Sequence, residues 1–166
     1  MMNYANDNRP LNSVFLGLGT NLGDKKKNIE ESLKKIEKQI GNIVSLSALF
    51  LSKPQGFESK NIFVNCAIHI ETLLTPHELL FETQSIEKEM GRIDKSDAEG
   101  YADRIIDIDI LFYNNLVIND NSTLIIPHPH IEERDFVVKP MAEIAPHLLH
   151  PILKKTVEEL LNAFCS

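Results

Sequence analysis

The sequence predicts an α+β protein with a ferredoxin-like sandwich fold, in which helices pack on one face of a mostly antiparallel sheet. The main observation is the order of its segments. Strand-like runs of β-branched residues are interrupted twice by helical spacing, giving β-α-β-β-α-β with a late hairpin. The chain also has 166 residues, of which 43% are hydrophobic and 25% charged. This size and balance favour one domain with a sizeable core.

The first half of the chain is expected to form three strands and one helix. SVFLGL, at 13–18, has the composition of a buried strand and ends in glycines. Asp24 is a suitable N-cap for a helix, whose apolar residues recur at helical spacing until Gly41 ends it. The stretches 42–52 and 62–72 are predicted as strands, with a loop of turn-forming residues between them.

The second half begins with a strong helix start in TPHE, at 75–78. Thr75 can cap the helix, proline takes the first position and glutamate the third, so a helix is expected to about Met90. A long polar loop, 91–103, follows, and loops of this kind in compact domains are often functional. A strand is then expected at 103–112, with a turn at 114–115 that leads into a short hairpin partner, LVIN. A loop or short helix is expected at 127–136, followed by irregular chain. The last predicted element is a helix at about 153–164.

Charge and cysteine content narrow the class of protein. The formal net charge of −7 argues against a nucleic-acid surface, because proteins that bind the phosphate backbone are usually basic. The two cysteines form no Cys-x-x-Cys pair and give no sign of zinc. The polar N-terminus has no apolar core of a signal peptide, and no apolar run is long enough for a membrane span. We expect a cytoplasmic protein with a flexible N-terminus, 1–12, and a single domain at 13–166.

Two carboxylates interrupt the strand-like stretch DRIIDIDILF. In a strand, Asp107 and Asp109 would project side by side, roughly 6–7 Å apart at the backbone. Adjacent carboxylates repel unless a cation lies between them, and hard divalent cations bind through a few carboxylates together with phosphates and water. A half-exposed strand with a solvated polar face has the same alternation and is the more common origin of this pattern when it stands alone. The neighbouring residues are what favour metal binding. The alternate residues, expected to face the core, are Ile106, Ile108 and Ile110.

Arginines and a histidine surround these carboxylates in the sequence. Arg92 and Arg104 bracket the polar loop, and His128 and Arg134 follow the strand. The planar guanidinium suits phosphate oxygens, although each arginine alone is typical of a protein surface. The run GLGTNLG has Leu22 where a dinucleotide-binding fingerprint needs its third glycine, and no P-loop motif is present. If the protein moves phosphate, arginines and metal would supply the electrostatics.

Two weaker sets of residues complete the candidates. Gln84 and Glu87 are three apart on the second helix and share a face, which is also the pattern of an exposed polar surface. Phe63 and Phe136 could enclose a flat heterocycle whose edge Asn65 reads by hydrogen bonding. On spacing alone, both aromatic residues fit the hydrophobic core better than a binding site.

Several longer motifs resemble one known family from residue 13 onward. They are GLGTNLGD, FVNCAI, QSIEKEMGR, RIIDIDIL and PHPHIEERDFVVKPMAEIAP. Their order and spacing resemble the 6-hydroxymethyl-7,8-dihydropterin pyrophosphokinases of folate biosynthesis. The resemblance implies transfer of pyrophosphate from ATP to the pterin hydroxymethyl group with release of AMP. It also implies one pyrophosphokinase domain at 13–166, two Mg²⁺ ions and ATP as co-substrate.

The resemblance further implies a role for each matched residue. The catalytic residues would be Arg92, Arg104, Asp107 and Asp109, of which the two aspartates would bind Mg²⁺. ATP would contact Gln84, Glu87, Arg92, Arg104, Ile110, His128 and Arg134. The pterin would contact Asn21, Ser52, Gln55, Phe63, Asn65 and Phe136.

Two other functions fit part of the pattern. A different metal-dependent phosphoryl enzyme, such as a nuclease, would also use paired aspartates and arginines. A ligand-sensing ferredoxin-like module would need neither. For the favoured function we expect small-molecule substrates, no nucleic acid or membrane partner, and a monomer.

Overall fold

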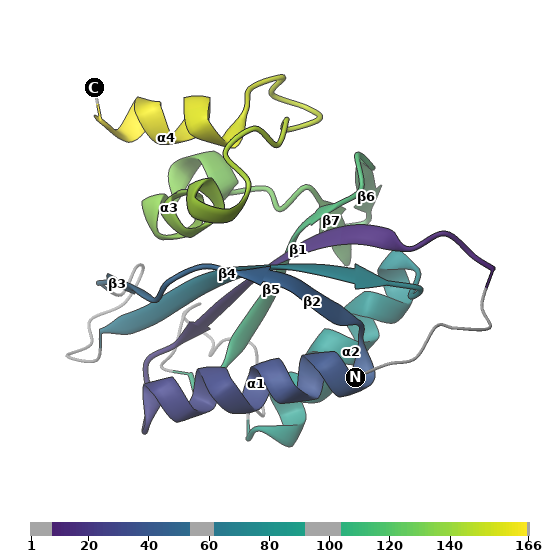
Figure 1. The fold of residues 1–166 in the computed structure, drawn as a ribbon, viewed down its shortest axis with the longest axis vertical. Helices are drawn as coiled ribbons and strands as arrows, with labels where there is room; N and C mark the ends of the chain where they lie inside the picture. Colours follow the sequence, from purple (N-terminus) through teal and green to yellow (C-terminus); the bar gives the residue numbers. More distant parts are fainter. Residues whose placement is uncertain (1–7, 54–61, 92–103, 166) are drawn as a thin grey trace.

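A single antiparallel sheet organises the chain, as the computed structural model shows for residues 8–53, 62–91 and 104–165 (Figure 1). β1 (Asn12–Thr20) lies between β4 (Phe63–Thr72) and β5 (Asp107–Tyr113). β2 (Asn42–Leu46) and β3 (Phe50–Ser52) both pair with β4, so the strand order is β2-β4-β1-β5 with β3 beside β4. The α+β class and the ferredoxin-like antiparallel sheet are therefore confirmed.

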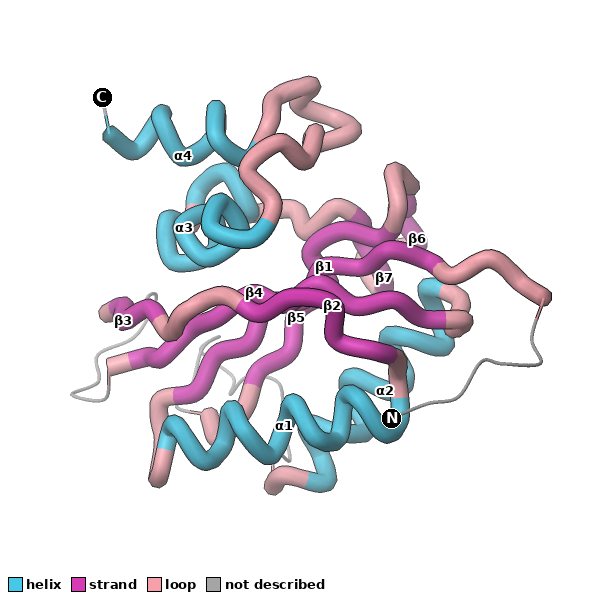
Figure 2. The backbone as a smooth tube through the Cα atoms, viewed as in Figure 1, coloured by secondary structure: helices cyan, strands magenta, loops and turns pink. Residues whose placement is uncertain are grey.

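Helices cover both faces of this sheet (Figures 1 and 2). α1 (Lys25–Gln39) and α2 (Pro76–Glu89) lie on one face, while α3 (Asp135–Ile144) and α4 (Val157–Cys165) lie on the other. The expectation that helices would pack on one face only is wrong. The reason is that both faces of the sheet carry apolar side chains, and each needs a covering layer.

Two hydrophobic clusters form the core, one on each face. The α1–α2 cluster contains Ile106, Ile108 and Ile110 of the β5 region, as their alternation predicts. The cluster beneath α3 and α4 contains Leu111 and Phe112, together with Val138, Met141 and Leu160 from the helices. Asp107 and Asp109 share the face of Leu111, so they point toward α3 rather than into the α1–α2 cluster.

The helix starts predicted at Asp24 and Thr75 are confirmed. Asp24 caps α1 by accepting a hydrogen bond from the backbone N–H of Lys27. Thr75 and Glu78 form a reciprocal capping box at α2, which ends at Glu89.

The predicted strand at 42–52 is interrupted. At Ser47 a side-chain oxygen replaces a backbone carbonyl as hydrogen-bond acceptor, since Oγ of Ser47 accepts the N–H of Ala67 at 3.0 Å. The N–H of Ala48 then leaves the sheet and donates to Glu143 of α3 at 2.7 Å. The stretch therefore forms two short strands with a bend between them.

Three expectations for the second half are wrong. The segment after Asn114 does not pair with β5, because β6 (Ile118–Asp120) pairs with β7 (Leu124–Ile126). The chain after 136 is helical, since α3 continues through Pro140. The last helix begins at Val157 rather than 153, where Thr156 and Glu159 form a hydrogen-bonded cap. A 3₁₀ turn, Ile131–Glu133, precedes α3.

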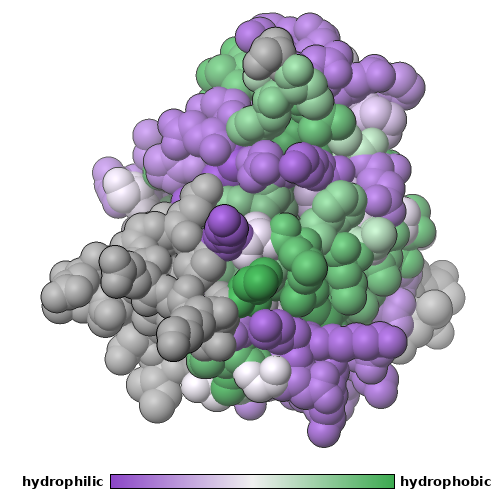
Figure 3. Space-filling view, turned by 90° about the vertical axis from the view of Figure 1, so that its left-hand side faces the viewer, coloured by the Kyte–Doolittle hydropathy of each residue, from purple (hydrophilic) through white to green (hydrophobic). Residues whose placement is uncertain are grey.

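The free edge formed by β2 and β3 carries exposed apolar side chains. Val44, Leu46, Leu49 and Leu51 are between 44% and 74% exposed. Figure 3 shows hydrophobic surface gathered between two hydrophilic bands on the side of the molecule where this edge lies. Within the described ranges, no helix is both long and apolar enough to span a bilayer.

Candidate active site

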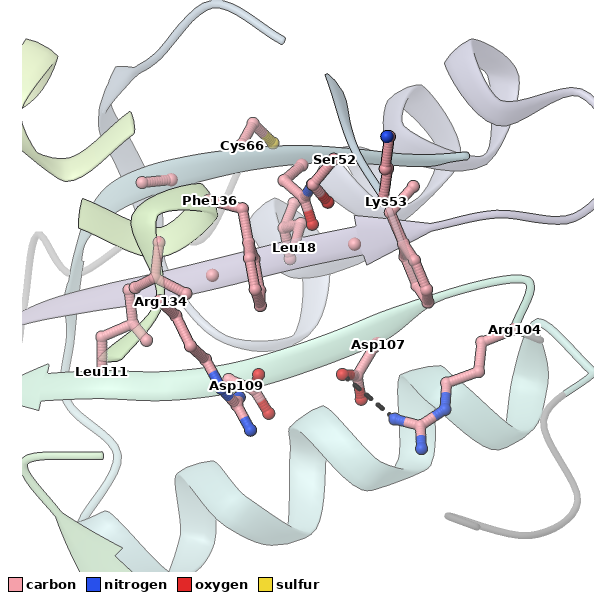
Figure 4. Close-up of a pocket in the computed structure, with 16 residues that line it drawn as sticks. Leu18, Ser52, Lys53, Cys66, Arg104, Asp107, Asp109, Leu111, Arg134 and Phe136 are labelled. Atoms are coloured by element: carbon pink, nitrogen blue, oxygen red, sulfur yellow. Dashed lines mark hydrogen bonds and ion pairs between the residues drawn. The ribbon is translucent and has the colours of Figure 1, made fainter. Parts of the chain in front are cut away.

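A pocket opens on the α3 face of the sheet, between the strands and the N-terminal end of α3 (Figure 4). Four strands and the segment entering α3 supply its walls. The lining includes Gly17, Gly19, Ser52, Lys53, Phe63, Asn65, Arg104, Asp107, Asp109, Arg134 and Phe136. The fold therefore brings together most of the described residues that the sequence singled out.

Glycines form the floor of this pocket. Gly19 lies between Asn65 of β4 and Asp107 of β5 in the strand register, and Gly17 likewise lies beside Asp109. A Cβ on Gly19 would lie 3.1 Å from Oδ1 of Asn65, tighter than an ordinary contact. Because no side chain rises from β1 here, the amide and the carboxylates face one continuous space.

At the carboxylate end of the pocket, two buried or partly buried aspartates lie close to each other and to two arginines. Nη1 of Arg104 lies 3.2 Å from Oδ2 of Asp107, and both side chains are largely shielded from solvent. Figure 4 shows Arg134 extending toward Asp109. Burial raises the pKa of Asp109 above its ordinary value, the charge of Asp107 raises it further, and Arg134 and Arg104 oppose the change. Ionisation of Asp109 beside the charged Asp107 is therefore unfavourable in the absence of a bound cation.

This arrangement fits Mg²⁺. In the part of the chain that the structure describes, no three His, Cys, Asp or Glu side chains form a closed metal cage. Mg²⁺ rarely needs one, because it binds through one or two carboxylates and takes its other ligands from substrate phosphates and water. Asp107 and Asp109 would hold the ion, and its charge would relieve their repulsion.

The raised pKa of Asp109 predicts a pH dependence of metal binding. Mg²⁺ binds the ionised carboxylate, and a pKa above the ordinary value means that a proton must leave first. The affinity for Mg²⁺ with a non-hydrolysable ATP analogue should therefore rise from about pH 6 to about pH 9, where an ordinary aspartate would already be ionised. Titration calorimetry measures this, after correction for ionisation of the nucleotide itself. A flat profile would contradict the electrostatic description of this site.

His128 is held as a neutral hydrogen-bond donor near the carboxylates. Leu111 bulges out of the β1–β5 register, and its carbonyl accepts the backbone N–H of His128 at 3.0 Å. Nδ1 of His128 accepts the N–H of His130, so Nε2 carries the proton. Burial, assisted by Arg134, lowers the pKa of His128 to about 4. The ring therefore offers an uncharged Nε2–H near neutral pH.

The other end of the pocket is aromatic and amide-lined. Phe63 and Phe136 both line it, and Figure 4 shows Phe136 reaching from α3 across the strands. The Nδ2 of Asn65 donates to Oγ of Ser52 at 2.7 Å, and Asn65 is only 6% exposed. This end can hold a flat, apolar ring and hydrogen-bond its edge.

Other predicted residues lie outside this lining. Asn21 is fully buried and bonds to the backbone of Arg104. Glu87 is buried on α2, where its Oε2 accepts the N–H of Ile108 at 3.3 Å. Gln84 lies half-buried on α2, and the side chain of Ile110 belongs to the α1–α2 cluster. Arg92 and Gln55 fall outside the described residues, and the roles expected for all six remain predictions.

Sequence reasoning missed two features of the pocket. Lys53 lines it beside Ser52, but an isolated lysine at the end of a strand gives no signal in one sequence. The second feature is the glycine run GLGTNLG, which does not form a nucleotide-binding turn. Gly17 and Gly19 instead lie within β1 and serve as the pocket floor.

Paired carboxylates and arginines line a pocket that has an aromatic end, and a neutral histidine lies near the carboxylates. Such a set of groups is typical of enzymes that transfer phosphoryl groups to a small, flat substrate. The model of the 7,8-dihydro-6-hydroxymethylpterin-pyrophosphokinase family matches residues 15–146, and the chain belongs to this family.

Individual relatives agree with this assignment. The 2-amino-4-hydroxy-6-hydroxymethyldihydropteridine pyrophosphokinase of Aquifex aeolicus is 39% identical and is aligned over 92% of this chain and 96% of its own length. The folic acid synthesis protein FOL1 of Dictyostelium discoideum is 43% identical over 95% of this chain, which spans only 23% of that protein.

Solved structures show the same fold. The crystal structure of Plasmodium falciparum HPPK-DHPS wild type with pteroate superposes on this chain with a TM-score of 0.76 at 18% identity. The match covers 93% of this chain and 44% of that one, so the chain corresponds to one part of a longer protein there.

Proposed function

We propose that this chain transfers the pyrophosphoryl group of ATP to 6-hydroxymethyl-7,8-dihydropterin, giving AMP and the pterin diphosphate for folate biosynthesis. The observation that carries the proposal is the row Asn65–Gly19–Asp107 across three paired strands. It joins a pocket end suited to a heterocycle with an end suited to metal and phosphate. Both substrates can therefore meet above one glycine floor.

At the aromatic end, Phe63 and Phe136 would stack on the two faces of the pterin. Asn65 and Ser52 would hydrogen-bond its edge, with Gln55 as a further contact implied by the family resemblance. Stacking of a nucleic-acid base on an aromatic side chain contributes about 1–3 kcal/mol, by alanine substitution, and a pterin ring presents a similar flat face. These contacts would orient the ring with its hydroxymethyl group toward the carboxylate end of the pocket.

At the acidic end, Asp107 and Asp109 would hold two Mg²⁺ ions, which neutralise the ATP phosphates. Arg104, Arg134 and the Nε2–H of His128 would donate to phosphate oxygens as charge develops. The other nucleotide contacts of this proposal are Arg92, Gln84, Glu87 and Ile110.

The reaction itself is a substitution at the β-phosphorus. The pterin hydroxyl oxygen forms a bond to this atom while the bond to the α–β bridging oxygen breaks. The bridging oxygen leaves with AMP, and the hydroxyl proton is released. Such transfers depend on positioning and charge stabilisation more than on covalent help from the protein.

The nucleotide product tests this function. The chain is incubated with 6-hydroxymethyl-7,8-dihydropterin, ATP and Mg²⁺, and AMP is resolved from ADP. AMP that requires both pterin and Mg²⁺ supports pyrophosphoryl transfer. ADP would indicate a simple kinase, and the absence of turnover in a folded sample would favour a ligand-sensing module. A nuclease would cleave a polynucleotide instead of consuming the pterin.

We also propose that the chain acts as a cytoplasmic monomer on small-molecule substrates. Light scattering on the purified chain tests the oligomeric state. A mass near 18.8 kDa supports a monomer. Twice that mass would contradict it, and the exposed β2–β3 edge would then be the first surface to examine.

A further inference from the structure

Asn21 forms two hydrogen bonds with the backbone of Arg104, one to its N–H and one to its carbonyl. Its Oδ1 accepts the N–H of Arg104 at 2.6 Å, and its own N–H donates to the carbonyl of Arg104 at 3.0 Å. Asn21 is completely buried, so water does not compete for these bonds. Two hydrogen bonds to one residue fix both its position and its orientation.

The neighbours of Asn21 are held in turn by a small polar network. Nδ2 of Asn28 on α1 donates to the carbonyl of Leu22 at 2.8 Å and to Oγ1 of Thr20 at 3.2 Å. Thr20 is fully buried, and its Oγ1 also approaches the carbonyl of Arg104 at 3.5 Å. The turn after β1 therefore forms a rigid support rather than a free loop.

Fixing the backbone of Arg104 also fixes where its guanidinium can reach. Arg104 lies three residues before Asp107, and Nη1 contacts Oδ2 of that carboxylate at 3.2 Å. The side chain of Arg104 is only 10% exposed. A shift of its backbone would move the guanidinium away from the carboxylate end of the pocket.

From these contacts we propose that Asn21 is a positioning residue, which acts through Arg104 and sets the guanidinium against Asp107. This role differs from the pterin contact that the family resemblance implies for Asn21. It rests on the proposed pyrophosphoryl transfer for its kinetic consequence, but the hydrogen bonds can be tested without turnover.

The chain offers a matched control at the opposite end of the same pair of strands. Asn114 grips Ser13 in the same way, with Oδ1 accepting the N–H of Ser13 at 2.8 Å and its own N–H donating to the carbonyl at 2.7 Å. Asn114 is exposed and lies outside the pocket lining. It also has a left-handed backbone with φ of 49°, so alanine is more strained there.

The experiment compares Asn21→Ala, Asn21→Asp and Asn114→Ala in the full chain. In Asn21→Ala, kcat should fall about 10- to 100-fold, the cost of a small misplacement of a reacting group. The dissociation constant for the pterin should stay within about two-fold, as for an independent site. Asn21→Asp keeps the acceptor for the Arg104 N–H and should lie nearer to the wild type. Asn114→Ala should lose stability without losing kcat.

Amide hydrogen exchange measured by NMR separates the inference from the proposed function. The Arg104 N–H should be protected in the wild type and in Asn21→Asp, and should exchange faster in Asn21→Ala. Unchanged protection in Asn21→Ala would overturn the grip whatever the activity. Weaker pterin binding with unchanged kcat would overturn the positioning role in favour of a direct contact. A wild type that forms no AMP would refute the proposed function, while the exchange data would still decide the inference.

Discussion

Replacing Asp109 by asparagine is expected to reduce pterin-dependent AMP formation by at least about 10³-fold, because it weakens a metal site that must stabilise the transferring phosphates. The same change should make the metal-free protein more stable. Burial and Asp107 raise the pKa of Asp109. Between its ordinary and raised pKa, the folded form keeps a proton that the unfolded form has lost, so stability falls as pH rises through this range. Asparagine removes that penalty.

Two measurements check this prediction together. Rates of AMP formation give the catalytic effect, and thermal unfolding near neutral pH without metal gives the stability. Asp120→Asn is the matched control, since the side chain of Asp120 on β6 is half-exposed and its Oδ2 lies 2.8 Å from Nε2 of His77 at the surface. Retained activity in Asp109→Asn would contradict the metal assignment. A less stable metal-free protein would contradict the electrostatic argument.

Truncation of Phe136 should weaken pterin binding by roughly 5- to 150-fold, which corresponds to the loss of about 1–3 kcal/mol of stacking. Phe136 lines the pocket from the first turn of α3, and Arg134 lies beside its ring, with Cζ 5.8 Å from the centroid. Alanine would remove one wall of the aromatic end and leave the carboxylates in place. Nucleotide binding should therefore change little.

Fluorescence or calorimetric titration of the pterin measures this effect. Phe81→Ala provides the control, because Phe81 is 69% exposed on α2 and lies outside the pocket lining. Its pterin affinity should match that of the wild type. If Phe136→Ala bound the pterin as tightly as the control, the ring would not stack where the pocket places it.

The sequence predicted those parts of the fold that depend on neighbouring residues. The caps at Asp24 and Thr75 act within one turn, so their side chains alone identify them. The alternation of isoleucine and aspartate around Asp107 likewise predicted which side chains lie on each face of β5.

Features that depend on distant partners were missed. The bend at Ser47 needs Ala67 and Glu143, which are 20 and 95 residues from the groups they bond. α3 keeps its helix through Pro140 because Val138 and Met141 pack in the core, a gain that local propensity does not include.

The candidate site shows the same division. Two carboxylates on one strand face were visible as a pattern, and so was the cluster of arginine and histidine around them. The glycine floor was not, because it depends on the register that aligns Gly19 with both Asn65 and Asp107. The grip of Asn21 on Arg104 joins residues 83 apart and becomes visible only when β1 and β5 are paired.

The most direct test of the central claim is the identity of the pterin product. The chain is supplied with ATP, Mg²⁺ and 6-hydroxymethyl-7,8-dihydropterin, and the pterin fraction is analysed by mass spectrometry and ³¹P NMR beside the nucleotides. We predict one pterin diphosphate for each AMP, with the ester at the hydroxymethyl oxygen. A pterin monophosphate formed with ADP, or AMP released without any change in the pterin, would contradict pyrophosphoryl transfer by this site.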